Sequence, residues 1–243
     1  MKVQFAGCGD AFGSGGRFNT CLHVTDGNGA FLFDCGATSL VALKRLGIDC
    51  NAIDMILLTH FHADHCGGIP FFILDAQVNA KRKRPLTLAG PQGLRDWYDR
   101  AMALAFPGGR TLPYELDFVE LQTGQPADLC GRNVTAFPVD HDERAGPCLA
   151  YRIEADGQVL CFSGDTTWTE TLVDAARGAD LFICECYMFE QFRKSHMTLS
   201  VLRQHLPRIG AKRVILTHLS EDMLKRLNDV DLDCAVDGMV VEI

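Results

Sequence analysis

Three histidines and an aspartate stand close together in one short segment of the chain. Residues 60–65 read His-Phe-His-Ala-Asp-His, which places the side chains of His60, His62, Asp64 and His65 within six positions. Imidazole nitrogens and carboxylate oxygens are the donors that zinc, manganese and iron accept in proteins. The apolar run 53–58 directly before them is typical of a buried strand. A strand that ends in a tight loop can direct these side chains toward one point, so the segment predicts a metal site.

Three further donors follow other predicted strands along the chain: His141, Asp165 and His218. Because α/β proteins place functional groups at strand ends, we expect these residues to join the first cluster. A single tetrahedral ion takes four ligands, so seven donors predict two metal ions that share one carboxylate. The mixed nitrogen and oxygen donors favour two divalent ions, with Zn²⁺ as the first candidate and Mn²⁺ or Fe²⁺ as alternatives.

Two divalent ions at such a site would give the protein hydrolytic chemistry. Ions about 3.5–4 Å apart can hold a hydroxide between them and lower its pKa toward neutrality. They can also neutralise the charge that develops on a phosphoryl or acyl oxygen during attack. Asp64 could accept a proton in the same reaction, so we treat it as a candidate catalytic residue as well as a ligand.

The elements that must position these donors alternate along the chain. Strands are predicted at 2–6, 20–25, 30–34, 53–58, 86–89, 115–121, 133–139, 147–154, 158–163, 181–184, 213–217 and 239–243. Helices are predicted at 38–46, 91–106, 168–177, 198–206 and 220–227. Two packed sheets with helices outside satisfy this order. No low-complexity linker divides the chain, so we expect one domain over residues 1–243.

Composition limits the classes of function that the chain can serve. Of its 243 residues 47% are hydrophobic and 22% are charged, which is typical of a soluble globular protein. The formal net charge of −8 argues against a binder of bulk polyanions. The eleven cysteines include no C-x-x-C pair, and we interpret them as reduced, mostly buried thiols of a cytoplasmic protein. No apolar run approaches the roughly 18 residues that span a bilayer, so we expect no membrane partner.

The pattern H-x-H-x-D-H, followed by His141, Asp165 and His218, resembles the metallo-β-lactamase superfamily of hydrolases over nearly the whole chain. The resemblance implies a four-layer αββα sandwich in which two mixed sheets carry the metals at one edge. It implies one metal on His60, His62 and His141, a second on Asp64, His65 and His218, and Asp165 as the bridge. An aspartate at the bridging position resembles the phosphodiesterase and thioesterase branches. Asp34 matches a family aspartate that orients a metal-bound histidine.

His196 narrows the resemblance to one branch. A histidine between the bridging aspartate and the last metal histidine resembles ribonuclease Z and the small phosphodiesterases. There it contacts the phosphate and can protonate the leaving alkoxide, so His196 is the second candidate catalytic residue. The segment 236–239 is also similar to the small phosphodiesterase associated with phosphonate breakdown.

Ribonuclease Z itself matches less well, because it grips tRNA with a long arm between its second and third metal motifs. Only residues 142–164 separate His141 from Asp165 here, and they read as a plain hairpin. Together with the acidic balance, the missing arm argues against a large RNA partner. The basic run 81–84 is the counterargument, and we interpret it as a solvated helix end.

The glycine-rich opening, residues 7–16, superficially matches a dinucleotide-binding loop. Such a fingerprint needs a helix next, whereas the strand 20–25 follows. We therefore expect a loop near the metal site whose backbone N–H groups can contact a substrate phosphate.

The leading hypothesis is a dinuclear metal hydrolase that cleaves a small phosphodiester, such as a cyclic or modified nucleotide, through a metal-bridging hydroxide. One alternative is a thioester or lactone hydrolase of the same superfamily. Less favoured are a tRNA-processing endonuclease of the ribonuclease Z type and a non-catalytic binding protein on this scaffold. The resemblance also implies a homodimer.

Overall fold

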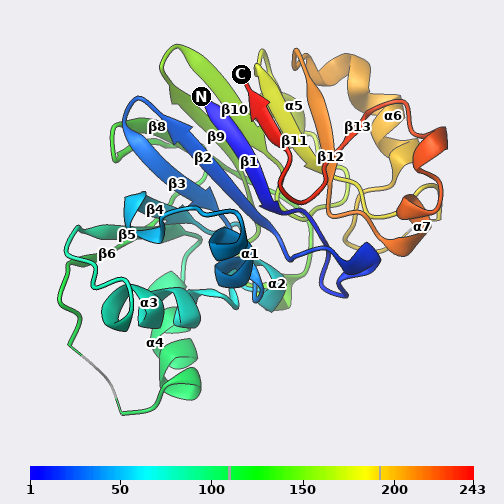
Figure 1. The fold of residues 1–243 in the computed structure, drawn as a ribbon. Coiled ribbons are helices and arrows are strands. Elements are labelled where there is room, and N and C mark those ends of the chain that lie inside the picture. The colour runs from blue at the N-terminus through cyan, green and yellow to red at the C-terminus, as the bar shows by residue number, and fades with distance from the viewer. Residues whose placement is uncertain (109–110, 192) are drawn as a thin grey trace.

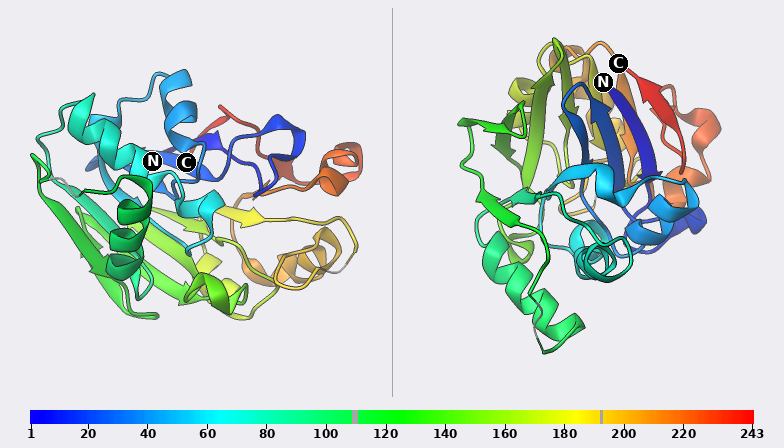
Figure 2. Two further views of the ribbon diagram at one scale, coloured as in Figure 1. Left: turned by 90° about the horizontal axis from the view of Figure 1, so that it is seen from below. Right: turned by 60° about the vertical axis from the view of Figure 1, so that its left-hand side comes forward.

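The computed structural model describes residues 1–108, 111–191 and 193–243, and it contains two seven-stranded sheets packed face to face (Figures 1 and 2). The first sheet has the order β14 (Val240–Glu242), β1 (Lys2–Gly7), β2 (Cys21–Asp26), β3 (Gly29–Phe33), β4 (Ile53–Leu57), β5 (Leu86–Gly90) and β6 (Leu116–Glu120). The second has the order β13 (Asp233–Cys234), β12 (Val214–Thr217), β11 (Leu181–Glu185), β10 (Gln158–Phe162), β9 (Leu149–Ala155), β8 (Arg132–Pro138) and β7 (Pro126–Leu129).

Both sheets are mixed. In the first, β14, β1, β2 and β3 pair antiparallel, and β3 to β6 pair parallel. In the second, β7 to β10 pair antiparallel, and β10 to β13 pair parallel. The pairing of β1 with β14 places the two chain termini side by side (Figure 1).

Helices cover the outer face of each sheet and complete the four-layer αββα sandwich that the sequence predicts. The first sheet carries α1 (Ser39–Arg45), α2 (Ala63–Cys66), α3 (Ile69–Val78) and α4 (Leu94–Ala105). The second carries α5 (Thr171–Ala176), α6 (Leu199–Ile209) and α7 (Glu221–Leu224). Among the described residues, no helix has the length and apolar content that crossing a membrane requires.

Central strands such as β3, β4 and β11 are rich in apolar residues because both faces of the sheet are covered there. In β3, Phe31 and Phe33 point into the core between the sheets, whereas Leu32 points toward the helices of the first sheet. Phe33 packs there against Tyr151 and Phe162 of the second sheet, at ring-centroid distances of 6.2 and 5.3 Å. One core therefore joins the two sheets, and it fixes the strand ends that carry the donor residues.

Four of the elements that differ from the sequence expectations have a clear physical reason. The helix predicted at 91–106 begins only at Leu94, because Gly93 adopts a left-handed conformation with φ 88° and Pro91 stays outside. Helix α3 is not predicted, since its sequence IPFFILDAQV is apolar on nearly every side and shows no helical period. Strands β7 and β13 are also missed, because four and two residues are too few for a pattern.

The basic run 81–84 is not a solvated helix end. Helix α3 ends at Val78, and the Arg82 side chain is 1% exposed, whereas its neighbours in the run lie at the surface. The guanidinium of Arg82 donates to the backbone carbonyls of Ile53 (2.7 Å) and Pro85 (2.6 Å). Arg82 thus closes the loop before β5, and its charge is not available to nucleic acid.

A buried arginine links the second sheet to the first, and its loss should destabilise the fold. Arg132 of β8 binds Asp26 of β2 through two hydrogen bonds of 2.7 and 3.0 Å, and Asp54 of β4 at 3.0 Å. Arg132→Ala leaves two carboxylates without their cation, so we expect the free energy of unfolding to fall by about 3–5 kcal/mol. Urea denaturation measures this loss. The control Arg213→Ala breaks the exposed pair with Asp233 and should cost about 0–1 kcal/mol; equal losses would contradict the expectation.

Candidate metal centre

The structure brings all seven predicted donors together at the ends of four strands. They form two groups whose ligand atoms lie within 4.8 Å of one another: His60, His62 and His141 in the first, and Asp64, His65, Asp165 and His218 in the second. His60 follows β4, and the tight turn into α2 places the other donors of 60–65 beside it. The strand-end argument from the sequence therefore predicts the position of the cluster correctly.

The first group presents three imidazole nitrogens to one point. His62 Nδ1 lies 3.2 Å from His60 Nε2 and 3.0 Å from His141 Nε2. The opposite nitrogen of His141, Nδ1, is 2.7 Å from the carbonyl oxygen of Ser195. Because a carbonyl only accepts, this Nδ1 carries the proton, and Nε2 turns a free lone pair toward the group. His60 Nδ1 is similarly held by Thr59 Oγ1 at 3.0 Å.

The second group combines two carboxylates and two imidazoles. His65 Nε2 lies 3.4 Å from Asp64 Oδ2 and 3.2 Å from Asp165 Oδ1. His218 Nε2 lies 3.2 Å from Asp64 Oδ2 and 3.3 Å from Asp165 Oδ2. The same Asp165 oxygen is 3.9 Å from His141 Nε2 of the first group. Asp165 is thus the residue that links the two groups.

These distances match the requirements of bound divalent ions. Ligands that hold Zn²⁺ at about 2.0–2.1 Å in a tetrahedron lie about 3.3 Å from one another, and the separations above fall close to that value. His65 Nε2 is buried and has no hydrogen-bond partner within the described ranges of the chain, although it faces two carboxylates. An orphaned buried nitrogen is costly unless something else binds it. The donor set therefore fits two metal ions.

Burial and neighbouring charges keep His60 and Asp165 in their metal-binding protonation states. Burial lowers the pKa of His60 well below its usual value, and His65 lowers it further, so this imidazole is neutral. Burial raises the pKa of Asp165, but His218 and His65 outweigh it and hold the pKa well below the usual range. Neutral imidazole and ionised carboxylate are the forms that coordinate metals. For His65 and His218, burial lowers the pKa, but the carboxylate of Asp165 outweighs it and raises the pKa.

Asp34 lies behind the second group, as the sequence predicts. Its Oδ2 is 2.7 Å from His65 Nδ1, and its Oδ1 accepts a hydrogen bond from the Thr59 backbone N–H at 2.8 Å. Asp34 has φ 57°, a left-handed conformation that is uncommon outside glycine. Gly164, before Asp165, has φ 57° as well, and a Cβ there would meet the Leu149 carbonyl at 2.8 Å. The surrounding structure holds the backbone in these conformations, and they direct the side chains of Asp34 and Asp165 toward the site.

Replacing Asp34 tests this support without touching a proposed ligand. In Asp34→Asn an amide faces His65 Nδ1, so the ring loses the partner that directs Nε2 toward the second group. We expect metal affinity to fall by about 10–100-fold. Competition with a zinc chelator measures the affinity, and circular dichroism checks the fold. Asp117→Asn, which changes an exposed carboxylate on β6, should leave affinity unchanged. Equal affinity in both variants would exclude the orienting role.

His196 stands at the wall of the site, on the segment between β11 and α6. Its Nδ1 lies 3.1 Å from Glu185 Oε1, and its ring stacks on Tyr187 with centroids 4.6 Å apart. Thr198 caps α6 by accepting from the Val201 N–H, and this fixes the segment that carries His196. Burial lowers the pKa of His196, but the Glu185 carboxylate outweighs it and raises the pKa to about 9.

A cavity of about 290 Å³ opens over the donors. Five of the seven donors line it, together with Ala11, Phe12, Tyr187 and His196. The glycine-rich opening of the chain therefore reaches the site, as the sequence predicts. A space of this size suits a small ligand.

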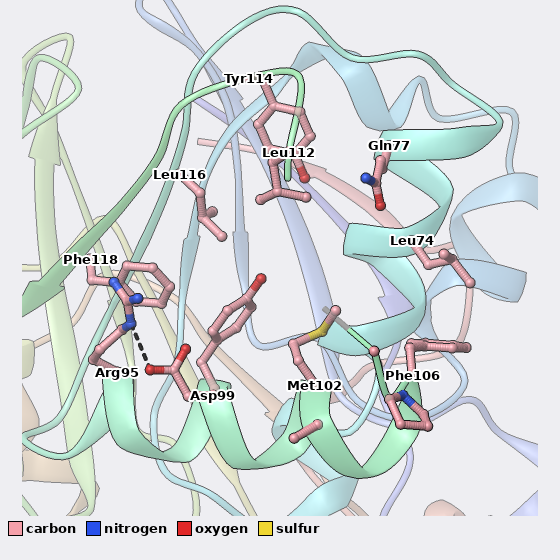
Figure 3. A pocket seen from close by; sticks show the side chains of 14 residues that line it. Leu74, Gln77, Arg95, Asp99, Met102, Phe106, Leu112, Tyr114, Leu116 and Phe118 are labelled. Carbon is pink, nitrogen blue, oxygen red and sulfur yellow. Dashed lines mark hydrogen bonds and ion pairs between the residues drawn. The ribbon is translucent and has the colours of Figure 1, made fainter. Parts of the chain in front are cut away.

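A larger cavity of about 650 Å³ lies elsewhere, between α3, α4 and β6 (Figure 3). Its walls are mainly apolar, and the ion pair of Arg95 with Asp99 (3.0 Å) stands on one side. None of the predicted site residues lines it. A choice of the functional site by cavity size alone would therefore select this cavity and miss the donor groups.

Four residues that shape the site are not predicted from the sequence: Thr59, Glu185, Tyr187 and Ser195. Glu185 offers the clearest signal, because it is a fully buried carboxylate at the end of the apolar strand β11. The rule that finds Asp165 at a strand end would also find it. The other three act through a hydroxyl, an aromatic ring and a backbone carbonyl, which no spacing marks.

Comparisons with known proteins agree with this site and fold. The model of the family described as "Anti-Pycsar protein Apyc1" matches residues 1–232. A relative named Ribonuclease Z from Lachnospira eligens is 27% identical, over 89% of this chain and 86% of its own length. The human short form of tRNase Z superposes with a TM-score of 0.80 at 24% identity, covering 100% of this chain and 99% of its own. The metallo-β-lactamase fold protein YhfI from Bacillus subtilis gives 0.82 at 22%, covering 99% of each chain.

These matches confirm the predicted sandwich and the predicted superfamily. They do not support the argument against a large RNA partner, since relatives named Ribonuclease Z match most of this chain. The acidic balance of the whole chain is a weak guide here, because a binding surface depends on local charge rather than on the sum.

Proposed function

Because the chain belongs to the family of the anti-Pycsar protein Apyc1, in the ribonuclease Z-like branch of the metallo-β-lactamase superfamily, it is a metal-dependent hydrolase, and we propose that it cleaves a small phosphodiester such as a cyclic or modified nucleotide. The observation that carries this proposal is the placement of His196. Its ring lines a cavity of about 290 Å³ beside the seven donors. The position suits a group that meets the leaving oxygen of a substrate bound over the donors.

We assign the metal ligands by the two groups in the structure. His60, His62 and His141 would hold one ion, Asp64, His65 and His218 the other, and Asp165 both. Zinc is the first candidate, because imidazole and carboxylate in tetrahedral spacing are its usual ligands. Two such ions would supply a nucleophilic water of lowered pKa and would offset charge on the phosphoryl oxygens.

Three side chains near the proposed ions have roles in proton transfer and positioning. Glu185 is fully buried and holds Nδ1 of His196, which leaves Nε2 to donate a proton to the departing alkoxide. Asp64 lines the cavity and has two acceptor oxygens, so it can take a proton as well as bind metal. The ring of Tyr187 packs against His196 and limits its rotation.

The shape of the site favours a small substrate over a long one. The residues between His141 and Asp165 fold into the turn Glu143–Ala145 and the hairpin of β9 and β10. No part of this stretch, all of which the structure describes, extends into an arm that could grip tRNA. A ribonuclease remains the second candidate, because curated relatives carry that name.

Substrate profiling separates the candidates. Purified protein loaded with Zn²⁺ or Mn²⁺ is assayed on 3′,5′- and 2′,3′-cyclic nucleotides, on a precursor tRNA with a 3′ trailer, and on a thioester and a lactone. We expect the highest kcat/KM on a cyclic nucleotide. Faster trimming of the precursor tRNA would favour the ribonuclease, and turnover of the thioester or lactone without any phosphodiester would overturn the proposal.

We also propose that residues 1–243 form one domain, that the protein is a homodimer and that it is cytoplasmic. The shared core between the two sheets supports the single domain. The eleven cysteines are all free, which agrees with a reducing compartment. Light scattering on the purified protein tests the homodimer, since a monomer mass would exclude it.

A further inference from the structure

We propose that Phe12 is an aromatic platform on which the base of a nucleotide substrate stacks, so that this residue sets the preference for phosphodiesters with a flat ring. The inference rests on the proposed function and concerns the base of the substrate, which the metal donors do not contact. Phe12 is 81% exposed, yet it is one of the residues that line the cavity over the donors. Its ring is therefore open to a ligand that already occupies the metal site.

The loop that carries Phe12 is held in place from beneath. Asp10 is fully buried, and its Oδ1 accepts from the backbone N–H groups of Phe12 (3.1 Å) and Ser14 (2.9 Å). Its Oδ2 accepts from Ser14 Oγ at 2.7 Å. The Asn19 side chain also donates to the Asp10 backbone carbonyl at 2.9 Å. One buried carboxylate thus fixes the turn on both sides of Phe12, and the ring stands on a rigid base.

A second anchor ties the far end of the loop to the other side of the site. The Gly15 N–H donates to Glu221 Oε1 at 2.9 Å, and Glu221 begins α7, shortly after the donor His218. The loop is therefore attached to the segment that carries a proposed metal ligand. A ring in a fixed position binds with little loss of conformational freedom, which makes it an efficient contact.

The chemistry of the cavity changes from its floor to its mouth. Imidazole and carboxylate donors form the floor, where a phosphodiester would bind, whereas Phe12 and Tyr187 contribute aromatic rings to the walls. Tyr187 already stacks on His196, so Phe12 is the aromatic ring with its face still accessible. A ligand with an anionic phosphate at one end and a flat aromatic ring at the other matches this arrangement. A nucleotide has that form, and a plain alkyl phosphodiester does not.

Stacking on an aromatic side chain tolerates every base, because each base has a π-face. The platform therefore predicts turnover of cyclic nucleotides with any of the common bases, with purines bound somewhat more tightly than pyrimidines because they offer a larger face. It does not predict a hydrogen-bonded readout of one base.

The test compares a 3′,5′-cyclic nucleotide with the cyclic ribose phosphate that carries a methoxy group in place of the base. We expect Phe12→Ala to raise KM for the nucleotide by about tenfold and to change kcat by less than about threefold. KM for the baseless analogue should stay unchanged. Phe12→Tyr should restore the wild-type KM, whereas Phe12→Leu, which keeps an apolar side chain without a ring face, should not.

Each other outcome has a defined meaning. Wild-type protein that cleaves neither compound and no 2′,3′-cyclic nucleotide overturns the proposed function, and the platform falls with it. Wild-type protein that cleaves the baseless analogue as fast as the nucleotide overturns the platform alone. If the wild type is active and Phe12→Ala changes KM equally for both compounds, or for neither, the platform alone is wrong. A full rescue by Leu would also overturn it, because an apolar contact and not stacking would then explain the effect. Metal content, measured in every variant, shows that the site itself is intact.

Discussion

Asp165→Ala should lower phosphodiester turnover by on the order of a thousandfold and reduce the metal content from two ions per chain to one or fewer. Asp165 is the residue whose oxygens approach both donor groups, at 3.2 Å from His65 Nε2, 3.3 Å from His218 Nε2 and 3.9 Å from His141 Nε2. Removing its carboxylate takes a ligand from both proposed ions, so the pair is no longer held together. Elemental analysis and steady-state kinetics on the same preparation measure the two effects.

The matched control for Asp165 is Asp140→Ala. Asp140 is an exposed carboxylate next to the donor His141, and its removal should leave two ions and wild-type turnover. Asp165→Asn keeps the size of the side chain and guards against a trivial loss of folding. Two ions and undiminished turnover in both Asp165 variants would show that this carboxylate does not bridge the groups.

The positions of the donors are predictable because each depends on a short stretch of chain. An apolar run ending in Thr59-His60, and a second ending in Thr217-His218, mark strand ends without reference to the rest of the fold. Strands β10 and β12 of the second sheet end at a common edge, and the packing of the two sheets brings the end of β4 from the first sheet beside them. The structure brings all seven together on this basis.

The contacts behind the donors are not predictable in the same way. Arg82 looks solvated in the sequence, but the loop before β5 encloses it and supplies backbone carbonyls as partners. Glu185 reaches His196 only because β11 and the segment before α6 meet in three dimensions. Helix α3 is buried too evenly to show a period. In each case the deciding partner comes from a distant part of the chain, and no local pattern encodes it.

Three of the six non-glycine residues with positive φ in the described part of the chain serve the site, and the other three, Lys81, Cys130 and Asp156, lie outside it. Asp34, Ser195 and His218 all adopt positive φ, at 57°, 74° and 58°. Each serves the site: one holds His65, one offers its carbonyl to His141, and one is a donor. Non-glycine residues persist in this region only where surrounding structure enforces it. The core between the sheets therefore helps to determine the geometry of the site, beyond stabilising the fold.

His196→Ala should reduce turnover of a cyclic nucleotide by about 10²–10⁴-fold while both metal ions remain bound. His196 lines the cavity, and its Nδ1 is held by Glu185 at 3.1 Å, so the variant removes a proton donor and no proposed ligand. Glu185→Gln keeps the imidazole but weakens its orientation, and it should give a smaller loss that falls on kcat more than on KM. His205→Ala is the matched control, because that ring stacks on Trp168 outside the cavity.

The leaving group decides whether His196 acts as an acid or only as a phosphate contact. In a cyclic nucleotide the leaving oxygen belongs to the ribose, and this alkoxide is a poor leaving group that needs a proton. The p-nitrophenolate ion is stable without one. If His196 donates the proton, His196→Ala should lose less than about tenfold on bis(p-nitrophenyl) phosphate, because Brønsted behaviour makes acid catalysis unimportant for a good leaving group. Equal losses on both substrates would mean that the imidazole binds the phosphate and transfers no proton. A loss of metal in the variant would instead move His196 into the ligand set, and the division of the site argued above would be wrong.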